Sequence, residues 1–214
     1  MSDADQRQAI VDACRDLAAQ GMFTGTSGNL SVRVGADMLI TPSGIPYPAL
    51  DADQIVEMAL DEDAPEALPV KPSSEWRFHR DILNARPEVQ AIVHTHSPYA
   101  TALSMTRQAI PPAHYMVAAF GGADVRCSDY ALFGSQALSD AALEALGGRA
   151  ACLLANHGAI TLGETLDKAL WRAVELETLA HQYILSLQAG GPVLLTELEI
   201  HDALEAFKGY GPKA

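Results

Sequence analysis

Two short apolar segments, 89–96 and 150–155, constrain the fold more than any other feature of the sequence. Both are rich in Val, Ile, Leu or Ala and too short for an average helix, so each predicts a buried β-strand. The first segment ends in His94-Thr95-His96, and Asn156-His157-Gly158 follows the second. A buried strand gives the side chains at its end a rigid base. The pattern therefore predicts a sheet that presents histidines at the ends of two strands.

The other periodic segments predict helices packed against this sheet. Apolar spacing predicts helices over 3–20, 75–84 and 165–189, and further strands over 30–34, 38–41 and 55–60. The turn Gly35-Ala36-Asp37 joins two of these strands into a hairpin, so part of the sheet is expected to be antiparallel. Ser73 or Ser74 is the expected cap of the second helix. A chain of 214 residues suits one sizeable core, so we expect one α/β domain over 1–214.

The chain is strongly acidic, with a formal net charge of −13. An acidic surface repels nucleic acid and anionic membranes, so neither is expected as a partner. It also repels a phosphorylated substrate, so an anion site would have to be local, built from backbone N–H groups or a metal ion. The start of the chain is polar, no apolar run approaches a membrane span, and no CxxC pair links Cys14, Cys127 and Cys152. These features predict a cytoplasmic protein with free, mostly buried thiols.

Three histidines are candidate metal ligands. His94 and His96 are two residues apart, and side chains at this spacing point to one face of a strand. Together with His157 they would provide three neutral imidazoles and an open fourth position, as in a catalytic zinc site. An HxH pair alone is a weak signal, and a chance pair of solvated histidines is the alternative. His79 lies one turn beyond Glu75 and is a candidate for supporting the site.

Small polar residues gather in three loops, Thr26-Ser27-Gly28-Asn29, Thr41-Pro42-Ser43-Gly44 and Pro72-Ser73-Ser74. Each loop can offer backbone N–H groups with a hydroxyl or amide to an anion, and the third opens a predicted helix. Plain turns and a helix cap are the alternative interpretation. Glu75 follows the third loop. It is either a capping carboxylate or a group beside phosphate and metal that ligates the ion and takes a proton.

Longer segments carry a resemblance to a known family. They are GTSGNLSVR, MLITPSGIPY, PSSEWRFHRDIL, AIVHTHSPYATALS, IPPAHYMVAAFGG and ANHGAITLG. On these segments the chain resembles the class II aldolase/adducin family over nearly its whole length, and within it the L-fuculose-1-phosphate aldolases. The resemblance implies a three-layer α/β/α fold with a mainly antiparallel central sheet. It also implies a homotetramer with its sites at subunit interfaces.

The resemblance further implies a reaction and the residues that perform it. The reaction is zinc-dependent, reversible cleavage of a ketose 1-phosphate, such as L-fuculose 1-phosphate, to dihydroxyacetone phosphate and a short aldehyde such as L-lactaldehyde. By resemblance, Zn²⁺ is bound by Glu75, His94, His96 and His157, with Glu75 also the acid/base, and Tyr115 assists from a neighbouring subunit. The residues implied in substrate binding are Gly28, Asn29, Ser43, Gly44, Ser73 and Ser74 for phosphate, and Phe133 and Tyr210 for the aldehyde end.

Relatives on the same scaffold leave alternatives open. Aldolases acting on 5-deoxyribulose 1-phosphate or methylthioribulose 1-phosphate would share every segment quoted above. Pentulose-phosphate 4-epimerases carry Asp where this chain has Glu75, and dehydratase-like members lack the segment His114-Tyr115-Met116. A non-catalytic adducin-like module should have lost the histidines. A Schiff-base aldolase needs a desolvated lysine, and of the four lysines only Lys71 lies near the predicted site in sequence.

Overall fold

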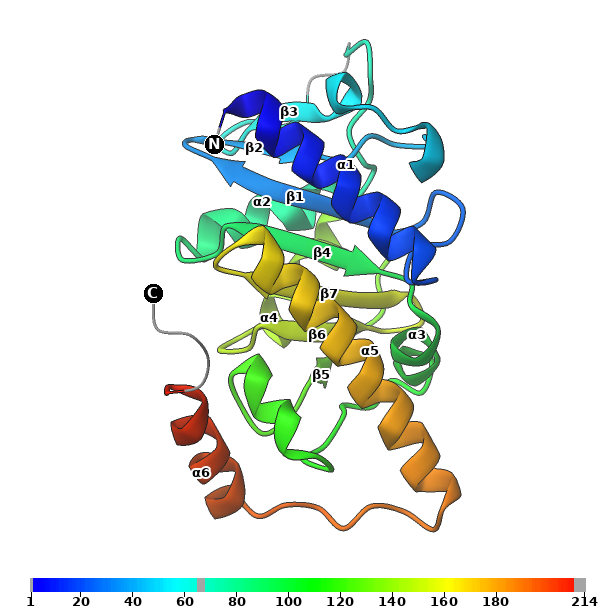
Figure 1. The fold of residues 1–214 in the computed structure, drawn as a ribbon, viewed down its shortest axis with the longest axis vertical. Helices are drawn as coiled ribbons and strands as arrows, with labels where there is room; N and C mark the ends of the chain where they lie inside the picture. Colours follow the sequence, from blue (N-terminus) through cyan, green and yellow to red (C-terminus); the bar gives the residue numbers. More distant parts are fainter. Residues whose placement is uncertain (1, 65–67, 210–214) are drawn as a thin grey trace.

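The structure, a computed structural model, describes residues 2–64 and 68–209. Its centre is a seven-stranded sheet in the order β3-β2-β1-β4-β7-β6-β5 (Figure 1). The strands are β1 (Asn29–Val34), β2 (Asp37–Ile40), β3 (Val56–Ala59), β4 (Ala91–Thr95), β5 (Arg126–Cys127), β6 (Ala151–Leu154) and β7 (Gly158–Gly163).

The resemblance implied a mainly antiparallel sheet, and the structure refines this to a mixed sheet with one parallel pair. The β5–β6 pair is parallel, while the other neighbouring pairs of described strands are antiparallel. A parallel pair needs a long crossover, and the chain between β5 and β6 provides one that contains helix α4 (Gln136–Ala145). The expected α/β class is confirmed.

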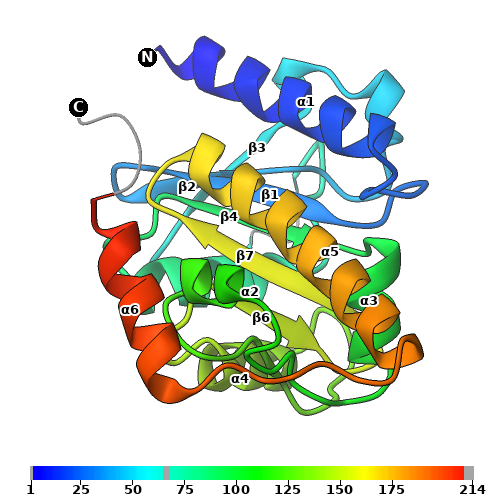
Figure 2. The same cartoon turned by 60° about the horizontal axis from the view of Figure 1, so that its bottom comes forward.

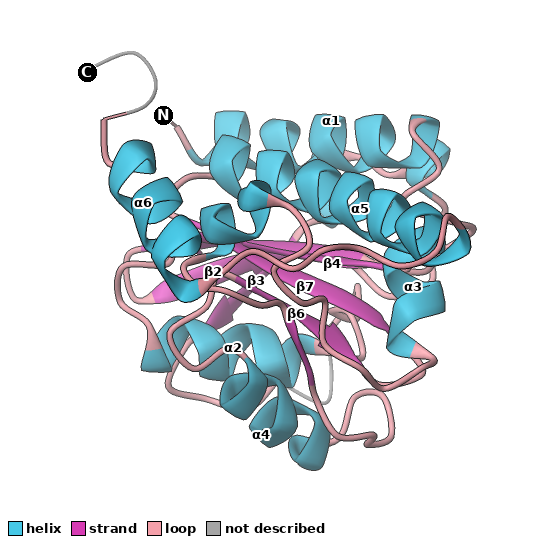
Figure 3. Cartoon of the chain, turned by 90° about the horizontal axis from the view of Figure 1, so that it is seen from below, coloured by secondary structure: helices cyan, strands magenta, loops and turns pink. Residues whose placement is uncertain are grey.

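Helices cover both faces of the sheet (Figure 2, Figure 3). Helices α1 (Asp3–Ala19) and α5 (Leu166–Gln188) lie on one face, and α2 (Trp76–Ala85) and α4 lie on the other. The remaining helices are α3 (Pro98–Ser104) and α6 (Glu197–Phe207), with the 3₁₀ turns η1 (Tyr47–Ala49), η2 (Ala52–Gln54) and η3 (Tyr115–Phe120). Strand β4 contributes Ile92 to the core under α2 and α4, and Val93 to the core under α1 and α5. Burial on both faces explains why this segment is continuously apolar.

Several expected elements are confirmed. The segments predicted as a hairpin form β1 and β2, which pair antiparallel with Val34 opposite Asp37. The helices predicted over 3–20 and 165–189 are α1 and α5. The helix predicted over 75–84 is α2, but it begins one residue later, and neither Ser73 nor Ser74 caps it. Glu75 occupies the cap position without a capping side-chain bond, because its carboxylate points away toward the histidines.

Strand β7 is one of the elements that the sequence did not predict. It begins at Gly158, directly after the histidine, and a glycine there had suggested only the end of a strand. All residues of β7 are buried, and the strand pairs with both β6 and β4. The tight turn between β6 and β7 contains Asn156, whose φ is +54°, and His157. This hairpin brings His157 beside the end of β4.

Two further predictions concern the cysteines and membranes. Cys14 and Cys152 are buried, Cys127 is half-buried, and all three are free, as expected. Among the described residues, no helix is long and apolar enough to span a bilayer.

Candidate active site

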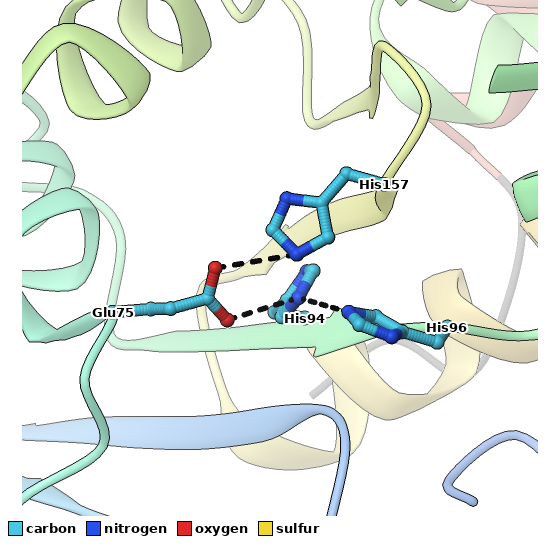
Figure 4. A group of neighbouring side chains, drawn as sticks. All are labelled: Glu75, His94, His96 and His157. Atoms are coloured by element: carbon cyan, nitrogen blue, oxygen red, sulfur yellow. Dashed lines mark hydrogen bonds and ion pairs between the residues drawn. The ribbon is translucent and has the colours of Figure 1, made fainter. Parts of the chain in front are cut away.

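Four side chains converge at the end of β4 (Figure 4). His94 and His96 come from the end of β4, His157 from the β6–β7 turn, and Glu75 from the residue before α2. His94 Nε2 lies 3.0 Å from His96 Nε2 and 3.2 Å from Glu75 Oε2, and His157 Nε2 lies 3.3 Å from Glu75 Oε1. One ligand atom from each residue lies within 4.8 Å of all the others. The four predicted metal ligands are therefore together.

The orientation of His94 exposes a lone pair to this cluster. The ring is fully buried, and its Nδ1 lies 3.0 Å from the carbonyl oxygen of Ala159 on β7. A carbonyl only accepts hydrogen bonds, so Nδ1 carries the proton and Nε2 turns its lone pair toward the other three residues. This is the arrangement by which a backbone carbonyl fixes the tautomer of a metal-binding histidine.

An unpaired oxygen of Glu75 indicates whether the cluster suits a cation. Glu75 is only 6% exposed, and its Oε1 has no hydrogen-bond partner among the described residues. A buried carboxylate oxygen without a donor costs free energy unless a cation or proton approaches it. Zinc bonds of about 2.0–2.1 Å in a tetrahedron place neighbouring ligand atoms about 3.4 Å apart, close to the shorter separations measured here. The donors fit a divalent metal ion.

The charge states also suit a cation. Burial, and then the proximity of the His94 ring, lowers the pKa of His96 and of His157 to about 4, so both imidazoles are neutral at pH 7. Burial raises the pKa of the Glu75 carboxyl, but the proximity of the His94 and His157 imidazoles and the hydrogen bond from the Asn29 amide outweigh it. The net shift holds that pKa well below its usual range. Neutral imidazoles and an ionised carboxylate are the forms that bind metal.

A cavity of about 380 Å³ opens in front of the cluster. It brings together most of the residues predicted for the site: Gly28, Asn29, Ser43, Gly44, Ser73, Ser74, Glu75, His96, Phe133 and His157. The three small-residue loops therefore meet at one place. Their clustering beside the four predicted metal ligands is difficult to explain if each were a plain turn.

Part of the expected anion-binding geometry is wrong. The backbone N–H of Ser43 donates to the Lys71 carbonyl at 2.9 Å, and that of Ser73 donates to the Thr41 carbonyl at 2.9 Å. These two N–H groups hold the second and third loops together and do not face the cavity. Helix α2 also begins after Glu75, so Ser74 is not its cap. The exposed hydroxyls of Ser43 and Ser74 remain available to an anion.

One predicted residue, Tyr115, lies apart from the cavity. Tyr115 is 53% exposed and lines a second cavity of about 1120 Å³. Trp171 on α5 and residues of α6 line the same cavity. Tyr115 therefore does not reach the histidine cluster of its own chain. Tyr210 lies outside the described residues. Phe133, by contrast, lines the first cavity and is 62% exposed.

The sequence did not predict two residues that line the cavity, Tyr130 and Ala131. They precede Phe133 in a loop without a periodic pattern, and no local signal separates them from ordinary loop residues. Asn156 also lines the cavity, and it was noticed only as part of Asn156-His157-Gly158. Its positive φ was not predictable, although Asn tolerates that conformation better than most residues.

Comparisons with known proteins agree with this geometry. The family described as "Class II Aldolase and Adducin N-terminal domain" matches residues 8–184. The chain is 49% identical to the 5-methylthioribulose-1-phosphate/5-deoxyribulose-1-phosphate aldolase of Rhodospirillum rubrum, over 97% of this chain and 93% of that protein. It is 44% identical to the L-fuculose phosphate aldolase of Escherichia coli K12, over 94% of each chain.

A solved structure of an L-fuculose 1-phosphate aldolase superposes with a TM-score of 0.92 at 37% identity, covering 97% of this chain and 98% of that one. Class II aldolases are metal-dependent carbon–carbon lyases, and this chain carries a Glu/His cluster able to hold the metal. The chain therefore belongs to the class II aldolase and adducin family, as one of its aldolases.

Proposed function

We propose that this protein is a zinc-dependent aldolase that cleaves a ketose 1-phosphate reversibly to dihydroxyacetone phosphate and a short aldehyde. The observation that carries the proposal is the buried Glu75 Oε1, which has no hydrogen-bond partner among the described residues and faces three histidines. His94, His96, His157 and Glu75 would hold the ion. A divalent cation bound there supplies a Lewis acid that polarises the substrate carbonyl and offsets developing negative charge.

Glu75 is the proposed acid/base. Its carboxylate is fixed beside the place where the ketose would bind, and its depressed pKa keeps it ionised at neutral pH. In the cleavage direction Glu75 returns a proton to the carbon of the enediolate that becomes dihydroxyacetone phosphate. In the reverse direction it removes that proton.

Neutral groups would hold the phosphate. The cavity carries the hydroxyls of Ser43, Ser73 and Ser74 on one side, with Gly28 and Gly44 in the adjoining loops. A net charge of −13 makes a basic binding field unavailable, so short-range hydrogen bonds must provide the affinity. Asn29 reaches the cavity too, although one of its amide hydrogens already binds Glu75.

The position of Tyr115 supports a site shared between subunits. Since Tyr115 lines a different cavity from the histidines, it can act on substrate only if it comes from another copy of the chain. We infer a homotetramer in which Tyr115 donates a hydrogen bond to the aldehyde oxygen of the neighbouring site. Phe133, and Tyr210 by resemblance, would contact the aldehyde end. We also infer one aldolase domain over 1–214 and, from the free thiols, a cytoplasmic location.

Three ketose phosphates are candidates for the substrate. L-fuculose 1-phosphate yields L-lactaldehyde, and the E. coli relative at 44% identity is named for it. The R. rubrum relative, at 49% identity, is named for 5-methylthioribulose 1-phosphate and 5-deoxyribulose 1-phosphate, which supports these two as the alternative substrates. Exposed Leu132 and Phe133 beside the cavity would suit the apolar end of each of the three aldehydes.

The decisive experiment combines metal analysis with an aldehyde panel. Purified protein is expected to contain one zinc per chain, to lose activity with a chelator and to regain it with Zn²⁺. Dihydroxyacetone phosphate is then supplied with L-lactaldehyde, acetaldehyde and methylthioacetaldehyde, and kcat/KM values are compared. Full activity in a metal-free preparation would refute the proposal, and borohydride trapping of substrate on a lysine would favour a Schiff-base aldolase instead.

A further inference from the structure

A chain of buried hydrogen bonds leads to Glu75 from behind. Ser31 Oγ on β1 lies 2.7 Å from His79 Nδ1 on α2, and His79 Nε2 lies 2.5 Å from Asn29 Oδ1. Asn29 Nδ2 in turn lies 2.9 Å from Glu75 Oε2. Ser31 and His79 are fully buried, Asn29 is 4% exposed, and neither Ser31 nor His79 lines the cavity. The two innermost residues therefore affect substrate only through Asn29 and Glu75.

The chemistry of the four groups fixes the direction of every bond. A carboxylate only accepts, so Asn29 must turn its amide nitrogen to Glu75 and its oxygen to His79. His79 Nε2 must then carry a proton. A fully buried imidazole with no carboxylate in contact stays neutral, so Nδ1 is bare and accepts from the Ser31 hydroxyl. Every donor in the chain thus points toward Glu75.

This direction makes the two oxygens of Glu75 unequal. Oε2 accepts a hydrogen bond from Asn29, whereas Oε1 has no hydrogen-bond partner among the described residues and lies 3.3 Å from His157 Nε2. The Asn29 amide therefore holds the carboxylate through Oε2. If the Asn29 amide were reversed, its oxygen would face the carboxylate and Oε2 would be repelled.

Building on the proposed function, we propose that Ser31, His79 and Asn29 position the Glu75 carboxylate for exchange of the substrate proton. The C–H bond of dihydroxyacetone phosphate breaks, its electron pair stays in the enediolate, and the proton goes to the Glu75 carboxylate. His79 is a positioning residue, because its Nε2–H keeps the Asn29 amide from reversing. A merely structural His79 would contribute packing alone, such as its stacking on Phe78 at 4.6 Å between ring centroids.

Two substitutions of His79 separate positioning from packing. His79→Gln keeps an N–H donor near the position of Nε2, whereas His79→Leu keeps a similar volume without a donor. Both lose the contact with Ser31 equally. Ser31→Ala is the milder third variant, since it removes the donor that keeps Nδ1 bare. His201→Leu, on the exposed face of α6, is the control for loss of a histidine.

The first readout is exchange of the substrate proton with solvent deuterium, which needs no aldehyde. We expect His79→Leu to lower kcat for exchange by about tenfold to hundredfold, the usual effect of one hydrogen bond to a charged group. KM should change less than kcat, zinc content should be unchanged, and His79→Gln should stay within about threefold of wild type. Equal losses in the Leu and Gln variants, or no loss in either, would overturn the positioning role.

The second readout needs neither metal nor activity. The chain has only three asparagines, Asn29, Asn84 and Asn156, so selective ¹⁵N-asparagine labelling gives three side-chain amide pairs. In metal-free protein the Asn29 pair, identified by its loss in Asn29→Ala, should exchange slowly in wild type and His79→Gln but rapidly in His79→Leu. The Asn84 pair, which bonds to the Leu60 carbonyl, should not change.

The two readouts also separate this inference from the proposed function. A wild-type protein without deuterium exchange would refute the proposed function, while the amide signals would still test the position of Asn29. If wild-type protein exchanges the substrate proton normally and the Asn29 amide exchange rate is the same in His79→Leu as in wild type, the positioning role is refuted and the proposed function is not. If His79→Leu does not fold, Ser31→Ala provides the test. We expect it to slow exchange of the substrate proton several-fold and to speed exchange of the Asn29 amide hydrogens. Wild-type values for both rates would overturn the proposal.

Discussion

Gly158 is the first residue of β7 and packs directly against the strand that carries two proposed ligands. A Cβ built on it would lie 2.3 Å from the Thr95 carbonyl oxygen, 3.0 Å from His96 Cδ2 and 3.3 Å from His94 Cε1. The first of these distances is shorter than van der Waals contact by about 1 Å, and the atom it meets is backbone. Gly158→Ala must therefore push β4 and β7 apart at the proposed metal ligands.

The expected magnitude has two parts. Overpacking of a close contact costs about 1–3 kcal/mol, which lowers Tm by about 2–12 °C for a chain of this length. Metal ligands tolerate displacements of only about 0.2 Å, so a shift approaching 1 Å should weaken metal binding by about tenfold to hundredfold. The first effect concerns the fold, and the second concerns the site.

Gly163, at the other end of β7, provides a matched control. Its Cβ would lie 2.3 Å from the Ala169 nitrogen and 2.5 Å from the Thr165 carbonyl oxygen, so Gly163→Ala should destabilise the fold similarly without moving the histidines. Stability is measured by thermal unfolding in excess chelator, and zinc affinity by competition with a chromophoric chelator. Equal zinc affinity in the two variants would refute the argument that Gly158 sets the ligand geometry.

Three further predictions follow from the site. Glu75→Gln should abolish deuterium exchange into dihydroxyacetone phosphate in a folded protein, and native-rate exchange would exclude Glu75 as the base. Tyr115→Phe should slow carbon–carbon cleavage by about 10²–10³-fold while sparing deuterium exchange. Mixed tetramers of Tyr115→Phe and Glu75→Gln chains should regain cleavage activity. Equal loss of cleavage and exchange in Tyr115→Phe would instead place Tyr115 at the proton transfer. Burial lowers the pKa values of His96 and His157 from 6.5 to about 4 and of His79 to about 3, so below pH 6.5 the unfolded chain binds protons that the folded chain does not. As the pH is lowered from about 6.5 to 4, the free energy of unfolding of metal-free protein should fall by up to about 1.4 kcal/mol per histidine and pH unit. A free energy of unfolding that stays constant over this range in chelator-treated protein would contradict the prediction.

Local signals in the sequence were sufficient for much of the fold. The β1–β2 hairpin followed from its turn residues, and α1 and α5 followed from their apolar spacing. Strand β7 was missed because a glycine at its start resembles a strand end, and the short β5 because two residues carry no periodic pattern. The start of α2 was misplaced because serines that resemble helix caps instead join two loops.

The sequence by itself determined which residues have the chemistry: two histidines at the end of one strand, a third after another, and a carboxylate behind a small-residue loop. Their convergence was decided only by tertiary structure, since β7 pairs with β4 and β6 and thereby brings the turn that carries His157 to His94. The same holds for the unequal oxygens of Glu75. They depend on Ser31 and Asn29 from β1 meeting His79 from α2, and a hydrogen bond between residues 48 or 50 positions apart leaves no local pattern in a sequence.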